Sequence, residues 1–370
     1  MPNLRFPEFT DEWKESELQD ISKISKGSGI SKDQLSEKGT PCILYGELYT
    51  KYKSEIISEV LSKTEINEKN LVHSRKNDII IPSSGETAID ISTARYIPFD
   101  DIFIGGDLNI IRLHDQDGRF FSYQLNGVRK LDIAKIAQGV SVVHLYGENL
   151  KKLKVKFPSI KEQNKISSLL TLIDERIVTQ SKIIEDLEKL KSAISKKVFT
   201  NLFTNHIVKL GDICLITTGR LDANAMTEEG QYMFFTCSKE NYRTISFAFD
   251  GEALLIAGNG EIGNVKYYDG KFNAYQRTYV LQQFTENIKY LQFYIEYHLP
   301  KRVIKEKNVG AMPYIVLSTL ANMPIRLPSV TMQNNISQSL ELIENKIKIE
   351  NTNLTLYVQQ KQYLLRHLFI

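Results

Sequence analysis

The sequence is poor in the residue types that build disulfide frameworks and metal centres. Its 370 residues include three cysteines without a C-x-x-C spacing, so neither a disulfide scaffold nor a zinc site of that kind is indicated. The six histidines are scattered, and none is paired at the spacing of metal ligands. We therefore expect no metal in this chain, and small buried side chains at Cys42, Cys214 and Cys237.

Long apolar runs are also missing. No stretch of 18 apolar residues occurs, so no membrane-spanning helix is expected. The first residues lack the basic and then apolar pattern of a secretory signal. Together these two absences predict a cytoplasmic protein.

Catalytic signatures are absent as well. The chain has no G-x-x-x-x-G-K-[ST] phosphate loop, no G-x-S-x-G nucleophile motif and no Asn-Pro-Pro-Tyr methyltransferase motif. Residues 258–263 fit the G-x-G-x-x-G dinucleotide pattern, but a strand-like segment and a hairpin signal follow where a nucleotide site needs a helix. We interpret residues 258–263 as a tight turn, and Glu344-Asn345-Lys346, which matches a nuclease E-x-K element, as surface charge. The chain is predicted to bind a ligand without catalysing a reaction.

One long segment occurs twice. Phe157-Pro158-Ser159-Ile160 opens the first copy, and Leu327-Pro328-Ser329-Val330 opens the second, 170 positions later. Apolar residues then recur in steps of four and three, the heptad pattern of a helix that pairs with another helix. The twelve positions expected to form this seam are Ile166, Leu170, Ile173, Ile177, Ile184, Leu187, Ile336, Leu340, Ile343, Ile347, Leu354 and Tyr357. Polar Gln180 and Glu350 occupy matching seam positions, where they would fix the register. We predict an antiparallel coiled coil, because tandem copies favour a pseudo-two-fold arrangement.

Each long helix is preceded by a β-rich segment. Leu18-Gln19-Asp20-Ile21 before the first helix recurs as Leu210-Gly211-Asp212-Ile213 before the second, and short β-prone runs broken by Gly, Ser and Asn follow in both. The sequence therefore predicts an α+β fold with a pseudo-two-fold internal repeat. Its segments are module 1 over 1–158, a long helix over 159–204, module 2 over 205–328 and a second long helix over 329–370. Within the modules we expect helices over 126–139 and 288–307 and a strand over 150–157.

The loops inside the two modules barely resemble each other, for example residues 27–39 against residues 219–230. Loops carry the ligand-facing part of a fold, so related modules with unlike loops predict two different targets. The net charge of +3 neither requires nor excludes nucleic acid, and local charge must decide. The side chains that suit phosphate contact or base readout are Arg75, Lys76, Arg119, Tyr123, Gln124, Arg220, Asn224, Lys239, Tyr242, Arg243, Gln276 and Arg277.

This organisation resembles the specificity subunit of a type I restriction-modification system, and the resemblance covers the whole chain in architecture. The segments that carry it are residues 4–9 with Trp13, the repeated segments at Leu18 and Leu210, and the helices that open at Pro158 and Pro328. The second helix departs from the pattern, because Met332-Gln333 stands where the first helix has Glu162-Gln163.

The resemblance implies that each module is a target-recognition domain for one half of a split DNA site, and that the paired helices set the gap between the halves. It implies a non-catalytic subunit that binds double-stranded DNA, two methyltransferase subunits, and restriction or motor subunits. S-adenosylmethionine, ATP and Mg would be bound by those partners. The alternative from the residues alone is a coiled-coil adaptor whose two β modules bind proteins; a steep loss of binding with rising salt would favour DNA.

Overall fold

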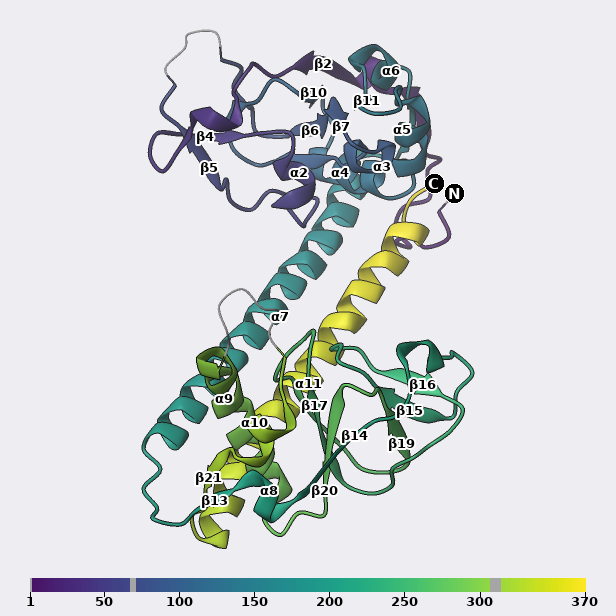
Figure 1. Cartoon of the computed structure of the whole chain (residues 1–370). Coiled ribbons are helices and arrows are strands. Elements are labelled where there is room, and N and C mark those ends of the chain that lie inside the picture. Colours follow the sequence, from purple (N-terminus) through teal and green to yellow (C-terminus); the bar gives the residue numbers. More distant parts are fainter. Residues whose placement is uncertain (1, 67–70, 307–313) are drawn as a thin grey trace. The chain divides into compact units, whose positions relative to one another are not determined.

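The computed structural model describes residues 2–66, 71–306 and 314–370. The chain forms two compact units, unit 1 from Met1–Ser181 with Thr352–Ile370 and unit 2 from Lys182–Asn351. The long helices are α7 (Ile160–Thr200) and α11 (Val330–His367), and each contributes one part to each unit (Figure 1). The boundaries expected at 158, 204 and 328 separate the modules from the long helices and stay a prediction. The compact units instead divide each long helix in two, because each half of a helix packs with one module.

Module 1 is built around a four-stranded antiparallel sheet in the order β2-β10-β6-β8. A second sheet, β3-β5-β4-β9, and the pairs β1-β12 and β7-β11 complete its strands. The strands are β1 (Lys14–Glu17), β2 (Ser22–Lys26), β3 (Leu35–Ser36), β4 (Thr40–Ile43), β5 (Ser62–Thr64), β6 (Asp78–Pro82), β7 (Ser84–Gly85), β8 (Arg95–Ile97), β9 (Phe103–Ile104), β10 (Leu108–Leu113), β11 (Val143–His144) and β12 (Lys154–Phe157). The short helices are α1 (Leu18–Ile21), η1 (Lys32–Gln34), α2 (Glu47–Thr50), α3 (Ala88–Ile91), α4 (Gly118–Asn126), α5 (Lys130–Ile136) and α6 (Gly147–Lys151).

Module 2 repeats this plan with a central sheet in the order β14-β20-β17-β18. A three-stranded sheet, β16-β15-β19, and the pair β13-β21 accompany it. The strands are β13 (Ile207–Lys209), β14 (Leu215–Thr218), β15 (Tyr232–Phe235), β16 (Tyr242–Thr244), β17 (Ala253–Ala257), β18 (Val265–Tyr268), β19 (Phe272–Ala274), β20 (Thr278–Gln282) and β21 (Pro324–Arg326). The helices are α8 (Leu210–Ile213), η2 (Ala223–Ala225), α9 (Ile288–Glu306) and α10 (Leu317–Ala321).

The equal strand orders confirm the predicted internal repeat. β2, β10 and β6 of module 1 correspond to β14, β20 and β17 of module 2, and in both modules a fourth strand, β8 or β18, pairs with the last of them. The repeat extends to close backbone contacts. Gly27 follows β2 and Gly219 follows β14. A Cβ atom at Gly27 would overlap the carbonyl oxygen of Gly105, and a Cβ atom at Gly219 would overlap that of Ala274. Glycine is therefore required at both matched positions.

A glutamine near the start of each long helix fastens that helix to its own module. Gln163 Oε1 accepts a hydrogen bond from the amide of Asp117 at 3.1 Å, and Gln333 Oε1 accepts one from the amide of Asn287 at 3.3 Å. Each glutamine Nε2 also donates to the proline carbonyl five residues earlier, at 2.9 Å and 3.2 Å. The matched residues lie 170 positions apart in the sequence, so the same junction is built twice.

The long helices pair in antiparallel fashion within each unit, as predicted. In unit 1, Leu170 and Ile173 of α7 share an apolar core with Leu364 near the end of α11. In unit 2, Leu340 near the start of α11 shares a core with Phe199 at the end of α7. Because early residues of one helix meet late residues of the other in both units, the two helices run in opposite directions.

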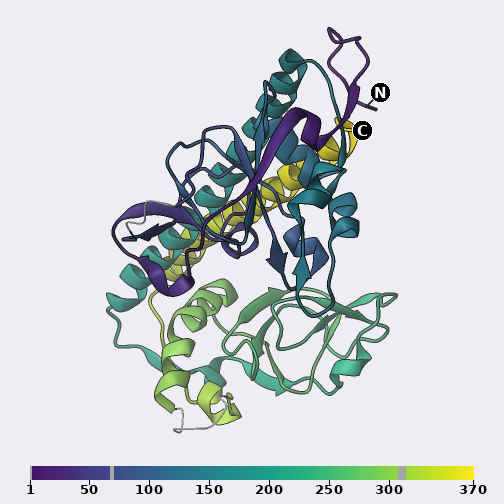
Figure 2. The same ribbon diagram turned by 90° about the horizontal axis from the view of Figure 1, so that it is seen from above.

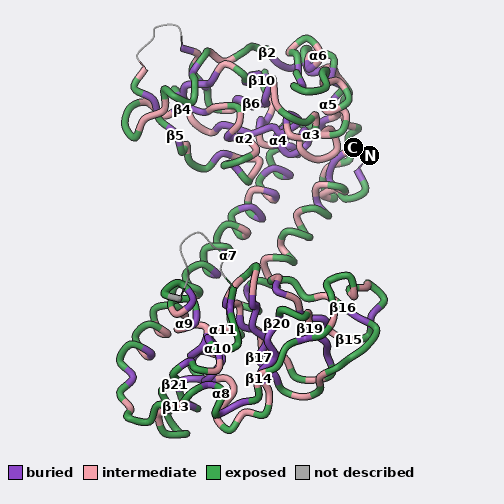
Figure 3. Tube along the Cα trace, viewed as in Figure 1, coloured by how far each residue is buried: buried purple, intermediate pink, exposed green. Residues whose placement is uncertain are grey.

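Along both long helices, buried and half-buried positions alternate with exposed ones (Figure 3). The twelve predicted seam residues are all buried or half-buried. Buried are Ile166, Leu170, Ile173, Ile184, Ile336 and Leu340, and half-buried are Ile177, Leu187, Ile343, Ile347, Leu354 and Tyr357. The polar seam residues Gln180 and Glu350 are buried as well. The outer ends of the seam belong to the apolar cores of the modules, so the helices are part of each module's core and not only a connection between modules.

Among the described residues, each unit contains a lysine held between two carboxylates. In unit 2, Lys191 Nζ lies 2.9 Å from Glu344 of α11 and 3.3 Å from Glu296 of α9. Burial lowers the pKa of Lys191, but the two carboxylates outweigh it, so the net pKa is raised.

The counterpart in unit 1 has the helices exchanged. Lys361 of α11 lies 2.6 Å from Asp174 of α7 and also pairs with Glu55 of module 1. Lys191 and Lys361 are 170 positions apart, and so are Asp174 and Glu344. The same pairing of lysine and carboxylate is therefore formed twice, with the lysine on α7 in one unit and on α11 in the other. Neither cluster was predicted, and Glu344 had been interpreted as surface charge.

Both ends of the chain belong to unit 1 and lie side by side (Figure 1 and Figure 2). The amide of Leu4 donates to the carbonyl oxygen of His367 at 2.9 Å. The Phe120 ring packs between Trp13, with centroids 5.7 Å apart, and Phe369, at 5.1 Å. The chain ends are thus fastened to module 1 through α4.

Three elements differ from the sequence prediction. The helix predicted over 126–139 is confined to α5 (Lys130–Ile136), and α4 occupies the segment before it, which had been interpreted as a ligand loop. The strand predicted over 150–157 is shorter, because residues up to Lys151 belong to α6. The helix predicted over 288–307 is observed to Glu306, and position 307 lies outside the described residues.

Candidate nucleic-acid interface

Several loops of module 2 meet at one edge of its central sheet. Thr218 at the end of β14 lies opposite Tyr279 near the start of β20, and Ala257 at the end of β17 lies opposite Thr278. In antiparallel strands these ends face the same way, so the loops after β14 and β17 and the loop before β20 emerge together. We call this the loop edge of module 2, formed by residues 219–226, 236–241, 258–264 and 275–277.

Backbone hydrogen bonds connect the loops of this edge. The amide of Gln276 donates to the carbonyl oxygen of Leu221 at 2.9 Å, and the amide of Gly258 donates to that of Arg277 at 3.0 Å. The amide of Glu261 donates to the carbonyl oxygen of Cys237 at 3.2 Å. The loops therefore hold one another in place. Residues 258–263 form the turn between β17 and β18, which confirms their interpretation as a tight turn and not as a nucleotide loop.

The structure brings together most of the candidates predicted in module 2. Those with exposed side chains in the loops of this edge are Arg220, Asn224, Lys239, Gln276 and Arg277. Tyr242 begins β16, opposite Phe234 of β15, and Arg243 follows with Nη1 donating to the carbonyl oxygen of Gly230 at 3.3 Å. These five candidates thus present three cationic side chains and two amides to solvent.

Lys266 supports the loop edge and was missed in the sequence. Its Nζ donates to the carbonyl oxygens of Ser238 and Glu240, both at 3.0 Å, and to Oδ1 of Asn241 at 2.9 Å. Burial lowers the pKa of this amine. Lys266 therefore fixes the conformation of the loop that carries Lys239, and only its position in β18 beside that loop reveals this function.

Three candidates of module 1, Arg75, Lys76 and Arg119, lie at the opposite edge of the corresponding sheet. Arg75 and Lys76 precede β6, and Arg119 follows β10, whereas the loop edge of module 2 follows β17 and precedes β20. Arg119 is half-buried and pairs with Asp117, its Nη2 lying 3.0 Å from Oδ2. We call this side, where Gln163 of α7 binds the module, the helix edge of module 1.

Two predicted DNA contacts of module 1 are contradicted by their burial. Tyr123 and Gln124 have no exposed surface. The hydroxyl of Tyr123 donates to Asp174 Oδ2 at 2.7 Å, and Nε2 of Gln124 donates to the carbonyl oxygen of Lys156 at 2.5 Å. Their mixture of aromatic and amide groups suggested a ligand loop, but Asp117 caps a helix here by accepting from the amide of Arg119, and that helix turns both side chains into the core.

The loop edge of module 1 consists of residues 27–34, 44–47 and 105–107. None of these residues is among the predicted DNA contacts, although residues 27–39 are one of the unlike loops expected to face a ligand. These loops enclose a pocket of about 810 Å³ whose lining includes Lys32, Tyr45, Lys51 and Asp107. Glu47 also lines this pocket, and its carboxylate accepts from Lys51 at 2.6 Å and from the amide of Leu44 at 3.0 Å. The repeat of Gly27 as Gly219 was the signal that could have identified these loops, because it aligns residues 28–34 with the loop that carries Arg220.

The described residues contain no helix with the length and apolar character that a membrane span needs. Within the same ranges, no group of three or more His, Cys, Asp or Glu side chains could hold a metal ion.

A duplicated α+β module with unlike loops at matched sheet edges, joined by paired helices, defines a two-headed recognition scaffold. The family described as "Type I restriction modification DNA specificity domain" matches this chain twice, over residues 10–189 and 204–357. The chain belongs to this family, and it is a specificity subunit of a type I restriction-modification system.

Relatives support this assignment over different lengths. The chain is 38% identical to the type I restriction enzyme EcoDI specificity subunit of Escherichia coli, over 37% of this chain and 30% of that protein. It is 24% identical to the MjaVIII specificity subunit of Methanocaldococcus jannaschii, over 95% of this chain and 89% of that protein. The fold matches the crystal structure of the type I S subunit from M. genitalium with a TM-score of 0.71, at 19% identity, over 100% of this chain and 99% of that one.

Proposed function

We propose that this chain recognises a bipartite DNA site, with the loop edge of each module contacting one half-site. The observation that carries the proposal is that the scaffold is repeated down to single hydrogen bonds, while the loops at the matched edges differ in sequence. A conserved frame with different loops is what two unlike half-sites require. Exposed Arg220, Gln276 and Arg277 supply groups that bind guanine or adenine edges in the major groove.

The chain would supply specificity without chemistry. In this proposal two methyltransferase subunits and restriction or motor subunits dock on it in the cytoplasm. S-adenosylmethionine, ATP and Mg then belong to those partners. The helices set the gap between the two half-sites, because they connect the modules.

Sequencing of methylated bases tests the proposal directly. The gene would be expressed with its methyltransferase partner in a host without other methylation, and the modified sites would be collected genome-wide. We expect two short fixed sequences separated by a gap of constant length. A continuous site, or no sequence preference, would contradict bipartite recognition. In a parallel binding assay with purified chain, affinity for duplex DNA should fall steeply with salt, whereas a protein-binding adaptor would show no such affinity.

A further inference from the structure

Asp107 of module 1 and Arg277 of module 2 occupy the same position in the repeated sheet. Each residue directly precedes a strand of its central sheet, β10 or β20, and the two lie 170 positions apart. The carbonyl oxygen of Asp107 accepts a hydrogen bond from the amide of Ser83, which follows β6, at 2.8 Å. The carbonyl oxygen of Arg277 accepts one from the amide of Gly258, which follows the matched strand β17, at 3.0 Å. The same backbone contact therefore holds both residues.

The residues that begin these two strands are matched as well. The carbonyl oxygen of Leu108 accepts a hydrogen bond from the amide of Gly27 at 2.9 Å. The carbonyl oxygen of Thr278 accepts one from the amide of Gly219 at 3.1 Å. Both donors are the glycines whose close backbone contacts leave no room for a side chain. The two loop edges are therefore aligned residue by residue where β10 and β20 begin.

The two matched residues carry opposite charges. The side chains of Asp107 and Arg277 are both exposed. The residues before them differ too, because module 1 has Gly106 where module 2 has Gln276. A Cβ atom at Gly106 would lie 3.1 Å from the Cα atom of Gly29, so the small residue allows two loops of module 1 to lie close together. At this position module 1 presents a carboxylate, whereas module 2 presents a guanidinium group and an amide.

Asp107 lines the pocket of about 810 Å³ at the loop edge of module 1. Glu47 is the other acidic residue of this lining, but it is 5% exposed, and its carboxylate binds Lys51 and the amide of Leu44. Asp107 therefore supplies the carboxylate that this pocket offers to a ligand. Exposed Lys32 lines the same pocket, so a cation suited to phosphate contact accompanies the carboxylate.

We propose that Asp107 selects a cytosine in the half-site of module 1, by accepting a hydrogen bond from the N4 amino group in the major groove. This inference rests on the proposed function. An ionised carboxylate accepts hydrogen bonds and donates none, whereas guanine and thymine present acceptor atoms at this edge. Adenine has an amino group beside its N7 acceptor, while cytosine presents the donor alone. Arg277 donates at the matched position and suits guanine, so one position of the repeated fold reads cytosine in one half-site and guanine in the other.

The test uses the full chain, expressed with its methyltransferase partner in a host without other DNA methylation. The variants are Asp107→Asn, which keeps the size of the side chain, and Asp107→Arg, which reproduces the residue of module 2. The matched control is Asp115→Asn, which removes the same charge beyond the other end of β10, where the side chain is exposed. Arg277→Ala identifies the half-site that belongs to module 2. Circular dichroism and the unfolding midpoint establish which variants fold, and methylated sites are collected genome-wide.

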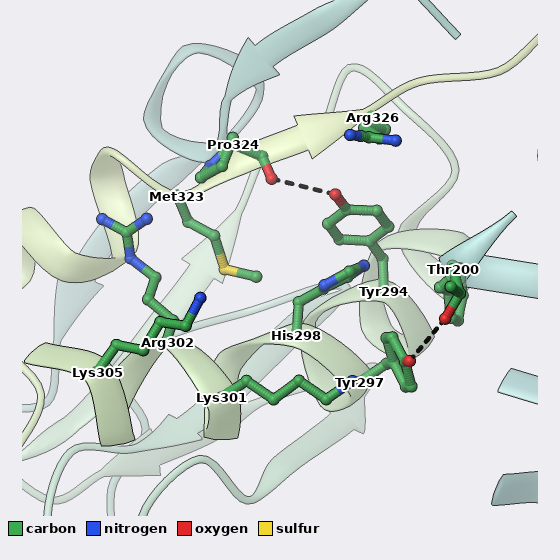
Figure 4. A pocket seen from close by; sticks show the side chains of 11 residues that line it. Thr200, Tyr294, Tyr297, His298, Lys301, Arg302, Lys305, Met323, Pro324 and Arg326 are labelled. Atoms are coloured by element: carbon green, nitrogen blue, oxygen red, sulfur yellow. Dashed lines mark hydrogen bonds between the residues drawn. The ribbon is translucent and has the colours of Figure 1, made fainter. Parts of the chain in front are cut away.

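A control for general charge effects comes from module 2. Lys301 of α9 lines a pocket beside the end of α7 and β21, and no residue of the loop edge contributes to that lining (Figure 4). The Lys301 side chain is exposed, so Lys301→Gln changes the net charge by one unit without altering the core. Neither Lys301→Gln nor Asp115→Asn should change the base preference of a half-site.

In wild type we expect a fixed cytosine in the half-site that Arg277→Ala leaves intact. Asp107→Asn should lower the preference for this cytosine about tenfold and favour adenine, whose N6 and N7 atoms suit an amide. Asp107→Arg should replace the cytosine by guanine, and every other fixed base should stay the same. If Asp107→Arg does not fold, Asp107→Asn decides alone.

A half-site of module 1 without a C·G pair overturns the inference, and so does an unchanged cytosine preference in Asp107→Asn. Equal changes in both half-sites would make Asp107 a structural residue and also overturn it. In each of these cases the site remains bipartite, so the proposed function stands. A wild-type site that is not bipartite contradicts the proposed function itself, and the inference falls with it.

Discussion

Lys191 of α7 lies 2.9 Å from Glu344 of α11, in a pairing that Lys361 and Asp174 repeat with the helices exchanged. At one seam position of each helix, a lysine thus pairs with one carboxylate of the other helix. Polar residues in a seam of this kind cost stability and fix register. We infer that the two ion clusters define how far α7 and α11 overlap.

Replacing Lys191 by Met should destabilise unit 2. The change leaves Glu296 and Glu344 close together without their cation, and the Lys191 side chain is only 22% exposed. Removing one partner of a partly buried ion pair should lower the free energy of unfolding by about 1 to 3 kcal/mol. Lys189→Met is the control, because Lys189 is exposed and pairs with the equally exposed Glu185 one turn earlier on the same helix. Denaturant unfolding measures both, and equal midpoints would show that the cluster does not support the helix pair.

Replacing Ile173 by Asp should destabilise unit 1. Ile173 is 8% exposed and belongs to the core shared by α7, α11 and module 1, whereas its neighbour Leu172 is 62% exposed. A carboxylate without a partner in that core should cost about 3 kcal/mol or more. Leu172→Asp places the same charge one residue away in solvent and should leave the unfolding midpoint nearly unchanged. If both variants unfold alike, the seam does not face the core.

Replacing Arg277 by Ala should weaken or relax the readout of one half-site and leave the other intact. Arg277 is exposed at the loop edge of module 2, and a bidentate arginine contributes about 1 to 3 kcal/mol of base discrimination. Arg75→Ala is the matched control, because Arg75 is equally cationic but lies before β6, on the helix edge of module 1. Methylated sites collected genome-wide for each variant provide the measurement. Equal damage to both half-sites would make Arg277 a general phosphate contact.

Lengthening both long helices by one heptad should lengthen the gap in the DNA site. Asp174 and Lys191 are 17 positions apart, as are Glu344 and Lys361, so insertions of seven residues after Thr179 and after Ile349 keep both spacings equal. Seven residues add about 10 Å of helix, which corresponds to about three base pairs. An insertion in α7 alone makes the spacings unequal and should reduce stability. A doubly extended, active chain with an unchanged gap would show that the helices do not measure DNA.

Lowering the pH should weaken unit 2 in part through His298. The pKa of this ring is lowered to about 4 in the folded chain, from an ordinary value near 6.5. Between these two values the unfolded chain takes up a proton and the folded chain does not, so stability falls as the pH drops from about 6.5 to about 4. His298→Gln should lose less stability than wild type over this interval. Unfolding curves at several pH values check this, and parallel losses would assign the effect to other groups.

Local patterns in the sequence determined the architecture. The 170-residue offset, the heptad steps and the repeated Leu18 and Leu210 segments predicted two α+β modules and two antiparallel helices, because repeats and periodicities are visible without knowledge of distant contacts. The hairpin signal after residues 258–263 likewise indicated that these residues form a turn and not a nucleotide-binding loop.

Tertiary structure alone decided which polar residues are exposed to solvent and which pair with distant parts of the chain. Tyr123 and Gln124 share their composition with a ligand loop, and only the packing of α4 removes them from solvent. Arg75 and Arg277 are both exposed cations near a strand, and only the strand pairing places them at opposite sheet edges. Lys191 and Glu344 are 153 positions apart and meet only because the helices fold back on each other. Side-chain burial and long-range pairing depend on contacts between segments far apart in the chain, which a local sequence pattern does not encode.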